Sequence, residues 1–196
     1  GDDVNQYTLS TAWDISTATY TRAFSVSAQE TDLTGLDFKT DGTEMYLCGE
    51  NGDDVNQYTL STAWDISSAS FTRVFSVAAK DTVPVDVKFR SDGLGMYVLG
   101  AASDAVHHYT LSTAWDISSA TFTTSFSVGS LALSPEGLAF NADGTRMYVG
   151  CTNTDSIYQY RTAPYATLTL PSSVVDPPST AIEETTATYN FTTLDG

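Results

Sequence analysis

Apolar and polar residues alternate with a period of two along short stretches of this chain. One such unit contains four segments of this kind: Leu36–Phe38, Met45–Cys48, Val55–Leu60 and Phe71–Val77. Alternation with a period of two is typical of strands, and a short run that is apolar on both faces indicates an inner strand covered on both sides. No stretch of 11 residues has the apolar spacing of an amphipathic helix. The sequence therefore predicts an all-β fold.

The whole unit returns with a period of 51 residues. The stretch Gly1–Ser16 recurs letter for letter at Gly52–Ser67, and a slightly altered copy begins at Ala105. The tryptophans at Trp13, Trp64 and Trp115 keep the same period. A repeat of this length that holds four strands is typical of a β-propeller blade. The fold class predicted is a β-propeller built from four-stranded blades.

Each repeat also contains one strong turn signal between its first two predicted strands. These are the pairs Asp41-Gly42, Asp92-Gly93 and Asp143-Gly144. An Asp-Gly pair between alternating segments favours a tight β-hairpin. We therefore expect each unit to be an antiparallel sheet.

The repeat ends near residue 161. We expect residues 1–161 to form about three and a quarter blades, and residues 162–196 to form a linker and the beginning of a second, β-sandwich-like module. Propellers close with about four to eight blades, and the chain begins in the middle of a repeat. We therefore expect it to belong to an oligomer or to a longer polypeptide, with the missing blades supplied there.

The charge balance narrows the range of partners. The chain has 24 acidic and 8 basic residues and a net charge of −16. Such a surface repels phosphates, so neither nucleic acid nor an anionic membrane is expected as a partner. Two explanations of the large negative charge remain open: solubility in a salty medium, where the charges are screened, and a surface that binds calcium. The sequence has no run of 18 apolar residues, so it predicts no membrane-spanning helix.

The two cysteines, Cys48 and Cys151, occupy different repeat positions two repeats apart. Their backbones are then too distant for a disulfide, so we expect two buried free thiols. Free thiols leave the redox compartment open.

Three sets of repeated or unusual residues invite a functional reading. The three tryptophans form either a ring of aromatic platforms for sugar or one buried structural anchor per blade, and packing favours the anchor. The turn carboxylates either bind calcium or are simply solvated; they are Asp2, Asp3, Asp53, Asp54 and Asp104. His107 and His108 are adjacent on a strand, so they point to opposite faces and cannot share one metal ion.

No motif for covalent chemistry stands out. The chain lacks a Gly-x-Ser-x-Gly elbow, a Gly-rich phosphate loop and a recognisable His–Asp pair beside a serine. Near-identical repeats also argue against the single special constellation that catalysis needs. The prediction is therefore that the chain has no catalytic, cofactor-binding or metal-binding residues and needs no cofactor.

The phrase Gly137–Gly150, with its pattern Gly-Leu-Ala-Phe, Asp-Gly and Met-Tyr-Val, resembles blades of the YVTN/NHL/lactonase-like propeller superfamily. The phrase Val55–Ser67 resembles repeats in tail-fibre and other virion proteins of marine bacteriophages. Enzymes of the superfamily bind a metal ion through separate Glu, Asn and Asp residues at the central channel. The resemblance therefore implies a propeller and, for its enzymes, lactone hydrolysis.

From these observations we expect a structural or adhesive propeller module without catalysis, in an extracellular assembly such as a phage tail fibre or virion appendage. It would bind other subunits and a cell-surface glycan or protein receptor. A bacterial secreted or cell-surface adhesion protein is the first alternative. A metal-dependent hydrolase of the lactonase type is the second, from a different functional class.

Overall fold

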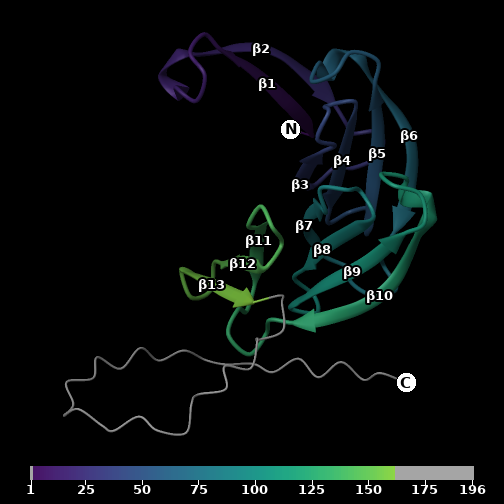
Figure 1. Ribbon diagram of the computed structural model, residues 1–196, viewed down its shortest axis with the longest axis vertical. Helices are drawn as coiled ribbons and strands as arrows, with labels where there is room; N and C mark the ends of the chain where they lie inside the picture. Colours follow the sequence, from purple (N-terminus) through teal and green to yellow (C-terminus); the bar gives the residue numbers. More distant parts are fainter. Residues whose placement is uncertain (1, 162–196) are drawn as a thin grey trace, which may run out of the picture.

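The computed structural model describes residues 2–161. Thirteen β-strands form four antiparallel sheets, which follow one another along an open arc (Figure 1). Each sheet coincides with one sequence repeat, so we number the sheets blade 1 to blade 4 in chain order. The all-β prediction is confirmed, because the helical elements in this range are three 3₁₀ turns of three residues each. The predicted linker and second module, residues 162–196, lie outside the described residues.

The second and third repeats each form a complete blade of four strands. Blade 2 consists of β3 (Leu33–Phe38), β4 (Glu44–Gly49), β5 (Asp54–Leu60) and β6 (Ala69–Ser76). Blade 3 consists of β7 (Pro84–Phe89), β8 (Gly95–Gly100), β9 (Ala105–Leu111) and β10 (Ala120–Ser127). In each blade the strands pair in chain order, as the hairpin signals predict.

The first and last blades have fewer strands within the described range. Blade 1 consists of β1 (Asp3–Leu9) and β2 (Ala18–Ser25). Blade 4 consists of β11 (Pro135–Phe140), β12 (Arg146–Cys151) and β13 (Ser156–Arg161). The thirteen strands agree with the number expected from the repeat.

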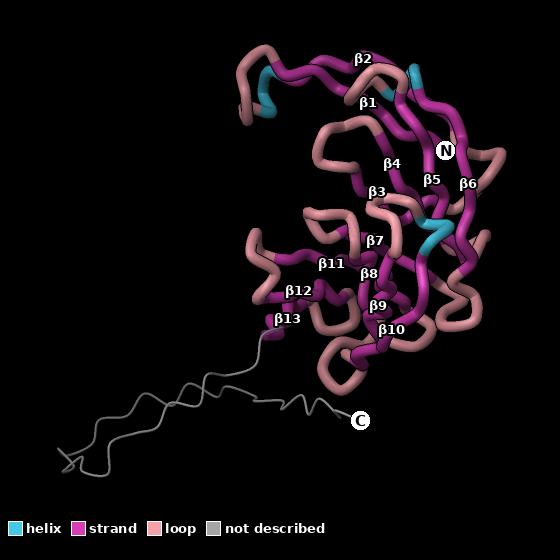
Figure 2. The backbone as a smooth tube through the Cα atoms, turned by 45° about the vertical axis from the view of Figure 1, so that its right-hand side comes forward, coloured by secondary structure: helices cyan, strands magenta, loops and turns pink. Residues whose placement is uncertain are grey.

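Neighbouring blades pack through their inner strands and faces. Strand β7 lies beside both β3 and β11, whereas β6 and β10 run along the outer rim of the arc (Figures 1 and 2). The blade 2–blade 3 interface buries residues from both sheets, including Tyr46, Val55, Met96 and Tyr109. The blade 3–blade 4 interface has its own core around Leu99, Leu138 and Val149. Packing between blades therefore places each inner strand at the centre of the arc.

A short 3₁₀ turn lies between the last two strands of each of the first three blades: Ile15–Thr17, Ile66–Ser68 and Ile117–Ser119. An aspartate precedes each turn, and its side chain accepts a hydrogen bond from the backbone N–H two residues on, as in Asp65 with Ser67 at 3.0 Å. The tryptophan just before each aspartate has a positive φ of 64° to 66°. The repeated Trp-Asp-Ile-Ser phrase thus forms the same hydrogen-bonded turn in all three blades and gives each tryptophan the same backbone conformation.

The free thiols predicted for Cys48 and Cys151 are confirmed, since both are buried and neither is paired. Burial raises the pKa of the Cys48 thiol to about 12. In residues 2–161 no helix is long and apolar enough to cross a membrane.

Candidate functional site

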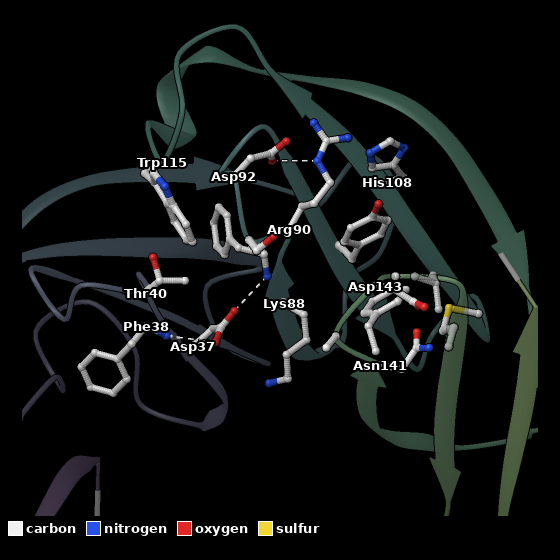
Figure 3. A pocket seen from close by; sticks show the side chains of 18 of the residues that line it. Asp37, Phe38, Thr40, Lys88, Arg90, Asp92, His108, Trp115, Asn141 and Asp143 are labelled. Carbon is white, nitrogen blue, oxygen red and sulfur yellow. Dashed lines mark hydrogen bonds and ion pairs between the residues drawn. The ribbon is translucent and has the colours of Figure 1, made fainter. Parts of the chain in front are cut away.

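A cavity of about 740 Å³ opens at the turn ends of blades 3 and 4, where β7 and β11 finish (Figure 3). Aromatic rings and charged side chains both line it. Its charged and polar wall includes Asp37, Lys88, Arg90, Asp92, His108, Asn141 and Asp143. Its aromatic wall includes Phe89, Tyr97, Trp115, Phe126 and Phe140. A largely apolar hollow with a few converging polar groups is the usual form of a small-molecule site.

The cavity lies where the repeated tryptophan cover is missing. Trp64 lies over the Gly42 turn of blade 2, and Trp115 lies over the Gly93 turn of blade 3. A Cβ atom added to either glycine would come within 2.3 to 2.4 Å of the indole ring, and each glycine has a positive φ of 73° to 74°. In blade 4 a Cβ atom on Gly144 would meet no described atom within 4 Å. The corresponding stretch of sequence reads Ala-Thr-Leu at 166–168 in place of Trp-Asp-Ile.

The residues that fasten two blades together also change at this interface. Gln57 of blade 2 donates to the Trp115 backbone oxygen at 3.0 Å and accepts from the Ile117 N–H at 3.3 Å. Gln6 makes the same pair of bonds to blade 2. Blade 3 has His108 at this repeat position.

A second fastening changes with the first. Arg22 of blade 1 forms an ion pair with Asp65 of blade 2, and Arg73 of blade 2 forms one with Asp116 of blade 3. Blade 3 has Thr124 at this repeat position, and Thr124 lines the cavity. Two blade-fastening residues and the aromatic cover are therefore altered together at the blade 3–blade 4 interface. Among the interfaces within residues 2–161, this is the one that lacks the repeated glutamine, arginine and tryptophan contacts.

The cavity contains two cations beside the carboxylates of Asp37, Asp92 and Asp143. Lys88 and Arg90, two of the eight basic residues, lie at the end of β7, and their side chains point in opposite directions (Figure 3). Lys88 forms an ion pair with Asp86 at 2.8 Å and also donates to the Leu36 carbonyl oxygen at 3.2 Å. Arg90 donates from Nε to Asp92 at 2.7 Å. Its two terminal nitrogens remain available to an anion, since these ends of the side chain have no described partner and Arg90 is exposed.

Two cavity groups have perturbed pKa values, and in both cases burial favours the neutral form. Burial raises the pKa of Asp37 even though the N–H groups of Phe89 and Phe38 donate to its carboxylate at 2.8 and 3.0 Å. Burial, with a smaller contribution from the charge on Arg90, lowers the pKa of His108 below 6.5. Titratable groups whose pKa values are perturbed by burial cluster at functional sites.

His108 is held in a defined orientation. Its ring stacks on Tyr97 with centroids 4.7 Å apart and an angle of 11° between planes, and Tyr97 in turn packs on Phe140 at 4.7 Å. At the preceding interface the equivalent rings Tyr46 and Phe89 are covered by Trp115. A histidine thus lies against the aromatic pair where the next blade's tryptophan would otherwise cover it.

The sequence-based interpretation of the tryptophans was partly wrong. They occupy equivalent turns, but Trp13 is 98% exposed and Trp64 is 52% exposed. Trp64 and Trp115 lie over the Gly42 and Gly93 turns, whereas no glycine turn within residues 2–161 lies against Trp13. Of the three tryptophans, only Trp115 lines the cavity.

The repeated turn carboxylates serve local structure. Asp53 and Asp104 have positive φ values of 50° and 47° in tight turns, and Asp104 accepts from the Ser134 N–H at 3.2 Å. Asp54 accepts from Asn56 at 2.6 Å, and burial together with Glu30 raises its pKa to about 6. Asp2 and Asp3 lie at the start of β1, apart from the cavity.

The metal site that the lactonase resemblance implies is not assembled by these residues. Residues 2–161 contain no group of three or more His, Cys, Asp or Glu side chains placed to hold a metal ion. His107 and His108 face opposite sides of blade 3, as expected for neighbours on a strand. No step of the chemistry below is therefore routed through a metal.

Sequence reasoning missed the cavity residues because it searched for motifs and treated the copies as equivalent. A usable signal was present in the differences between copies. Lys88 replaces Asp37 and Ala139 of the neighbouring blades, and His108 replaces Gln6 and Gln57. His108 is the clearer signal, because blades 1, 2 and 4 all have glutamine at this position (Gln6, Gln57 and Gln159) and blade 3 alone has histidine.

The sequence matches no protein-family model and no curated protein. Solved structures with the same fold do exist. A candidate 6-phosphogluconolactonase from Bacteroides fragilis is similar with a TM-score of 0.58 and 17% identity, over 82% of this chain and 44% of that one. A candidate 6-phosphogluconolactonase from Bacteroides uniformis has a TM-score of 0.59 and 13% identity, over 85% and 49% of the two chains. A protein from Lactobacillus plantarum has a TM-score of 0.55 and 18% identity, over 82% and 45%.

At these identities the similarity shows the fold alone, a β-propeller, and the chain spans less than half the length of these proteins. The prediction of a non-catalytic adhesive module of a phage tail fibre was wrong on this comparison. Two of these structures are named as candidate lactonases. The prediction that the chain is not an enzyme is corrected by the same finding.

Proposed function

We propose that the cavity between blades 3 and 4 is the substrate site of a lactonase-type hydrolase that opens an anionic sugar lactone. The observation that carries the proposal is the cavity itself, which holds two cations and a histidine with a lowered pKa on an otherwise acidic protein. The lactonase names of two proteins with the same fold support the reaction class.

Substrate binding rests on charge and on flat rings. Lys88 and Arg90 are the two cationic groups of the cavity that can pair with a phosphate or carboxylate group of the substrate. An arginine fork with two unoccupied nitrogens suits the paired oxygens of such a group. The faces of Trp115 and Phe140 give the apolar surface on which a sugar ring packs.

Hydrolysis needs a proton acceptor beside a stabilised oxyanion. His108 is neutral at pH 7 because its pKa is lowered, so it can take a proton from water as the water oxygen bonds to the lactone carbonyl carbon. The guanidinium of Arg90, close enough to influence His108 electrostatically, stabilises the negative charge that develops on the carbonyl oxygen. The ring C–O bond then breaks, and the departing ring oxygen receives the proton from His108.

The test is hydrolysis of 6-phosphogluconolactone and gluconolactone, followed by acid release at constant pH with the uncatalysed rate subtracted. His108→Gln restores the residue of blade 2 and should lower kcat roughly 100-fold with the fold intact. Arg90→Ala should raise KM for the phosphorylated substrate at least about tenfold. Lys39→Ala removes a cation from the equivalent turn of blade 2, outside the cavity, and should change neither value.

Hydrolysis no faster than the uncatalysed rate would remove the proposed activity. Equal rates for the parent, His108→Gln and Arg90→Ala would place the activity somewhere other than this cavity.

A further inference from the structure

Blade 3 differs from blade 2 at four more positions that lie together in space, on the side of the sheet away from the cavity. The replacements are Asp81 for Glu30, Ser103 for Gly52, His107 for Asn56 and Ser125 for Val74. Each blade 2 residue lacks the chemistry of its blade 3 counterpart, except for the shared carboxylate of Glu30 and Asp81. Together the four replacements give blade 3 a group of polar side chains that blade 2 does not have.

The four side chains form one chain of hydrogen bonds. Ser125 Oγ lies 2.8 Å from His107 Nδ1, and His107 Nε2 lies 3.0 Å from Ser103 Oγ. Ser103 Oγ donates to Asp81 Oδ2 at 2.5 Å, and the same carboxylate oxygen is 3.6 Å from His107 Nε2. Serine, histidine and aspartate thus follow one another in space although they are separated in sequence.

The hydrogen bonds fix which histidine nitrogen carries the proton. Ser103 gives its single hydroxyl proton to Asp81, so toward His107 it can only accept, and His107 Nε2 must be the donor. In the neutral imidazole Nδ1 is then unprotonated. The lone pair of Nδ1 faces Ser125 Oγ, which is the arrangement in which a histidine takes the proton of a serine.

Asp81 keeps this arrangement in place. Its side chain is buried, and burial opposes its charge, but hydrogen bonds from His107, Ser103 and the Val83 N–H lower its pKa to about 2. The carboxylate therefore remains ionised at neutral pH and holds the Ser103 proton. An ionised acid behind the histidine also stabilises the imidazolium that forms when His107 takes a proton.

The two serines are the accessible members of the set. His107 and Asp81 are each 3% exposed, whereas Ser103 is exposed in the turn before β9 and Ser125 is exposed on β10, the outer strand of the blade. His107 lies on the same strand face as Tyr109, whose ring packs edge-on against Phe75 of blade 2 at 5.4 Å. This site is therefore separate from the cavity, which His108 lines from the opposite face.

We propose that Ser125 is a nucleophile activated by His107, with Asp81 and Ser103 as positioning residues, and that it accepts acyl groups from carboxylic esters that reach it from solvent. Ser125 Oγ bonds to the carbonyl carbon while its proton passes to His107 Nδ1. The ester C–O bond breaks, and the departing alkoxide takes that proton. Water cleaves the acyl-serine by the same route and restores the hydroxyl group.

The test is labelling of the full 196-residue chain with a fluorophosphonate, in which a serine oxygen bonds to phosphorus and fluoride leaves. Peptide mass spectrometry should place the label on Ser125. His107→Asn and Ser125→Val return blade 2 residues to blade 3, so both variants should keep the circular dichroism and melting curve of the parent. His107→Asn should label roughly 100-fold more slowly, and Ser125→Val should lose the label.

Two controls separate activation from simple exposure. Ser127→Ala alters another exposed serine of β10 and should leave the labelling rate unchanged. Asp81→Asn should slow labelling, and Asp81→Glu, which restores the acid of blade 2, should recover most of the rate. Equal labelling of many serines, or an unchanged rate in a folded His107→Asn variant, would overturn the proposal. The result is independent of lactone hydrolysis in the cavity, which His108→Gln tests.

Discussion

The three tryptophans offer a graded experiment, because one local sequence is placed in three environments. We consider the substitution of each by alanine. Trp13 is 98% exposed, Trp64 is 52% exposed and packs on Gly42 and Phe38, and Trp115 is more deeply enclosed by Gly93, Phe89 and Tyr46. The covalent change is identical in each case, so the cost should follow the area buried.

In the folded protein Trp64 buries about half of the roughly 200 Å² of surface that a tryptophan side chain can bury. At about 25 cal/mol per Å², removal of the ring should lower the free energy of unfolding by about 2.5 kcal/mol. Trp115→Ala should cost about 3–5 kcal/mol, as for a large aromatic residue in a core. Trp13→Ala should stay within about 0.5 kcal/mol of the parent.

Urea unfolding followed by circular dichroism measures the series without relying on tryptophan fluorescence. Gly42→Ala provides a second check, since its Cβ atom would lie 2.3 Å from the Trp64 ring. Part of that cost should disappear when Trp64 is also alanine, although the positive φ of Gly42 leaves the remainder. If Trp13→Ala destabilised the protein as much as Trp64→Ala, the covering of the Asp-Gly turn would not be the function of these rings.

Three further predictions follow from single environments. The lowered pKa of His108 means that the unfolded chain binds the proton more readily, so stability should fall as the pH drops below about 6.5, and His108→Gln should remove that part of the fall in a series of urea melts. The raised pKa and burial of Cys48 should make its thiol inert to a disulfide reagent at pH 8 until urea unfolds the chain; rapid native-state labelling of Cys48 would contradict this. Within residues 2–161, β1 pairs with β2 on one side only, so the isolated chain should associate through the other edge of β1, and sedimentation showing only a monomer over a wide concentration range would count against it.

The repeat made the architecture predictable to a large degree. Alternation at Val55–Leu60 predicted strand β5, the Asp-Gly pairs predicted the hairpins, and the 51-residue period predicted sheets stacked as blades. Strand ends were less predictable. β3 begins at Leu33, three residues before the predicted Leu36, because backbone pairing with β4 extends past the apolar core of the segment.

The candidate site was less accessible to sequence reasoning, for a physical reason. The cavity lies at an interface that lacks the contacts made by Gln57 and Arg73 at the preceding interface. The sequence does not show that these two residues join neighbouring blades, because their partners across the interface are known only from the structure. His108 and Thr124 then stand out as departures from that pattern. The pairing of Ser125 with His107 similarly depends on cross-strand register, which brings together residues 18 positions apart.

The central claim is that the blade 3–blade 4 cavity binds an anionic sugar derivative, and NMR titration of the labelled chain with 6-phosphogluconate, the stable product of the proposed reaction, tests it most directly. The account predicts saturable shifts in the backbone signals of Arg90, His108 and Asn141, no comparable shifts at the equivalent blade 2 positions, and loss of saturation in Arg90→Ala. Saturable shifts that are centred elsewhere, or that persist unchanged in Arg90→Ala, would contradict it, as would the absence of any saturable shift.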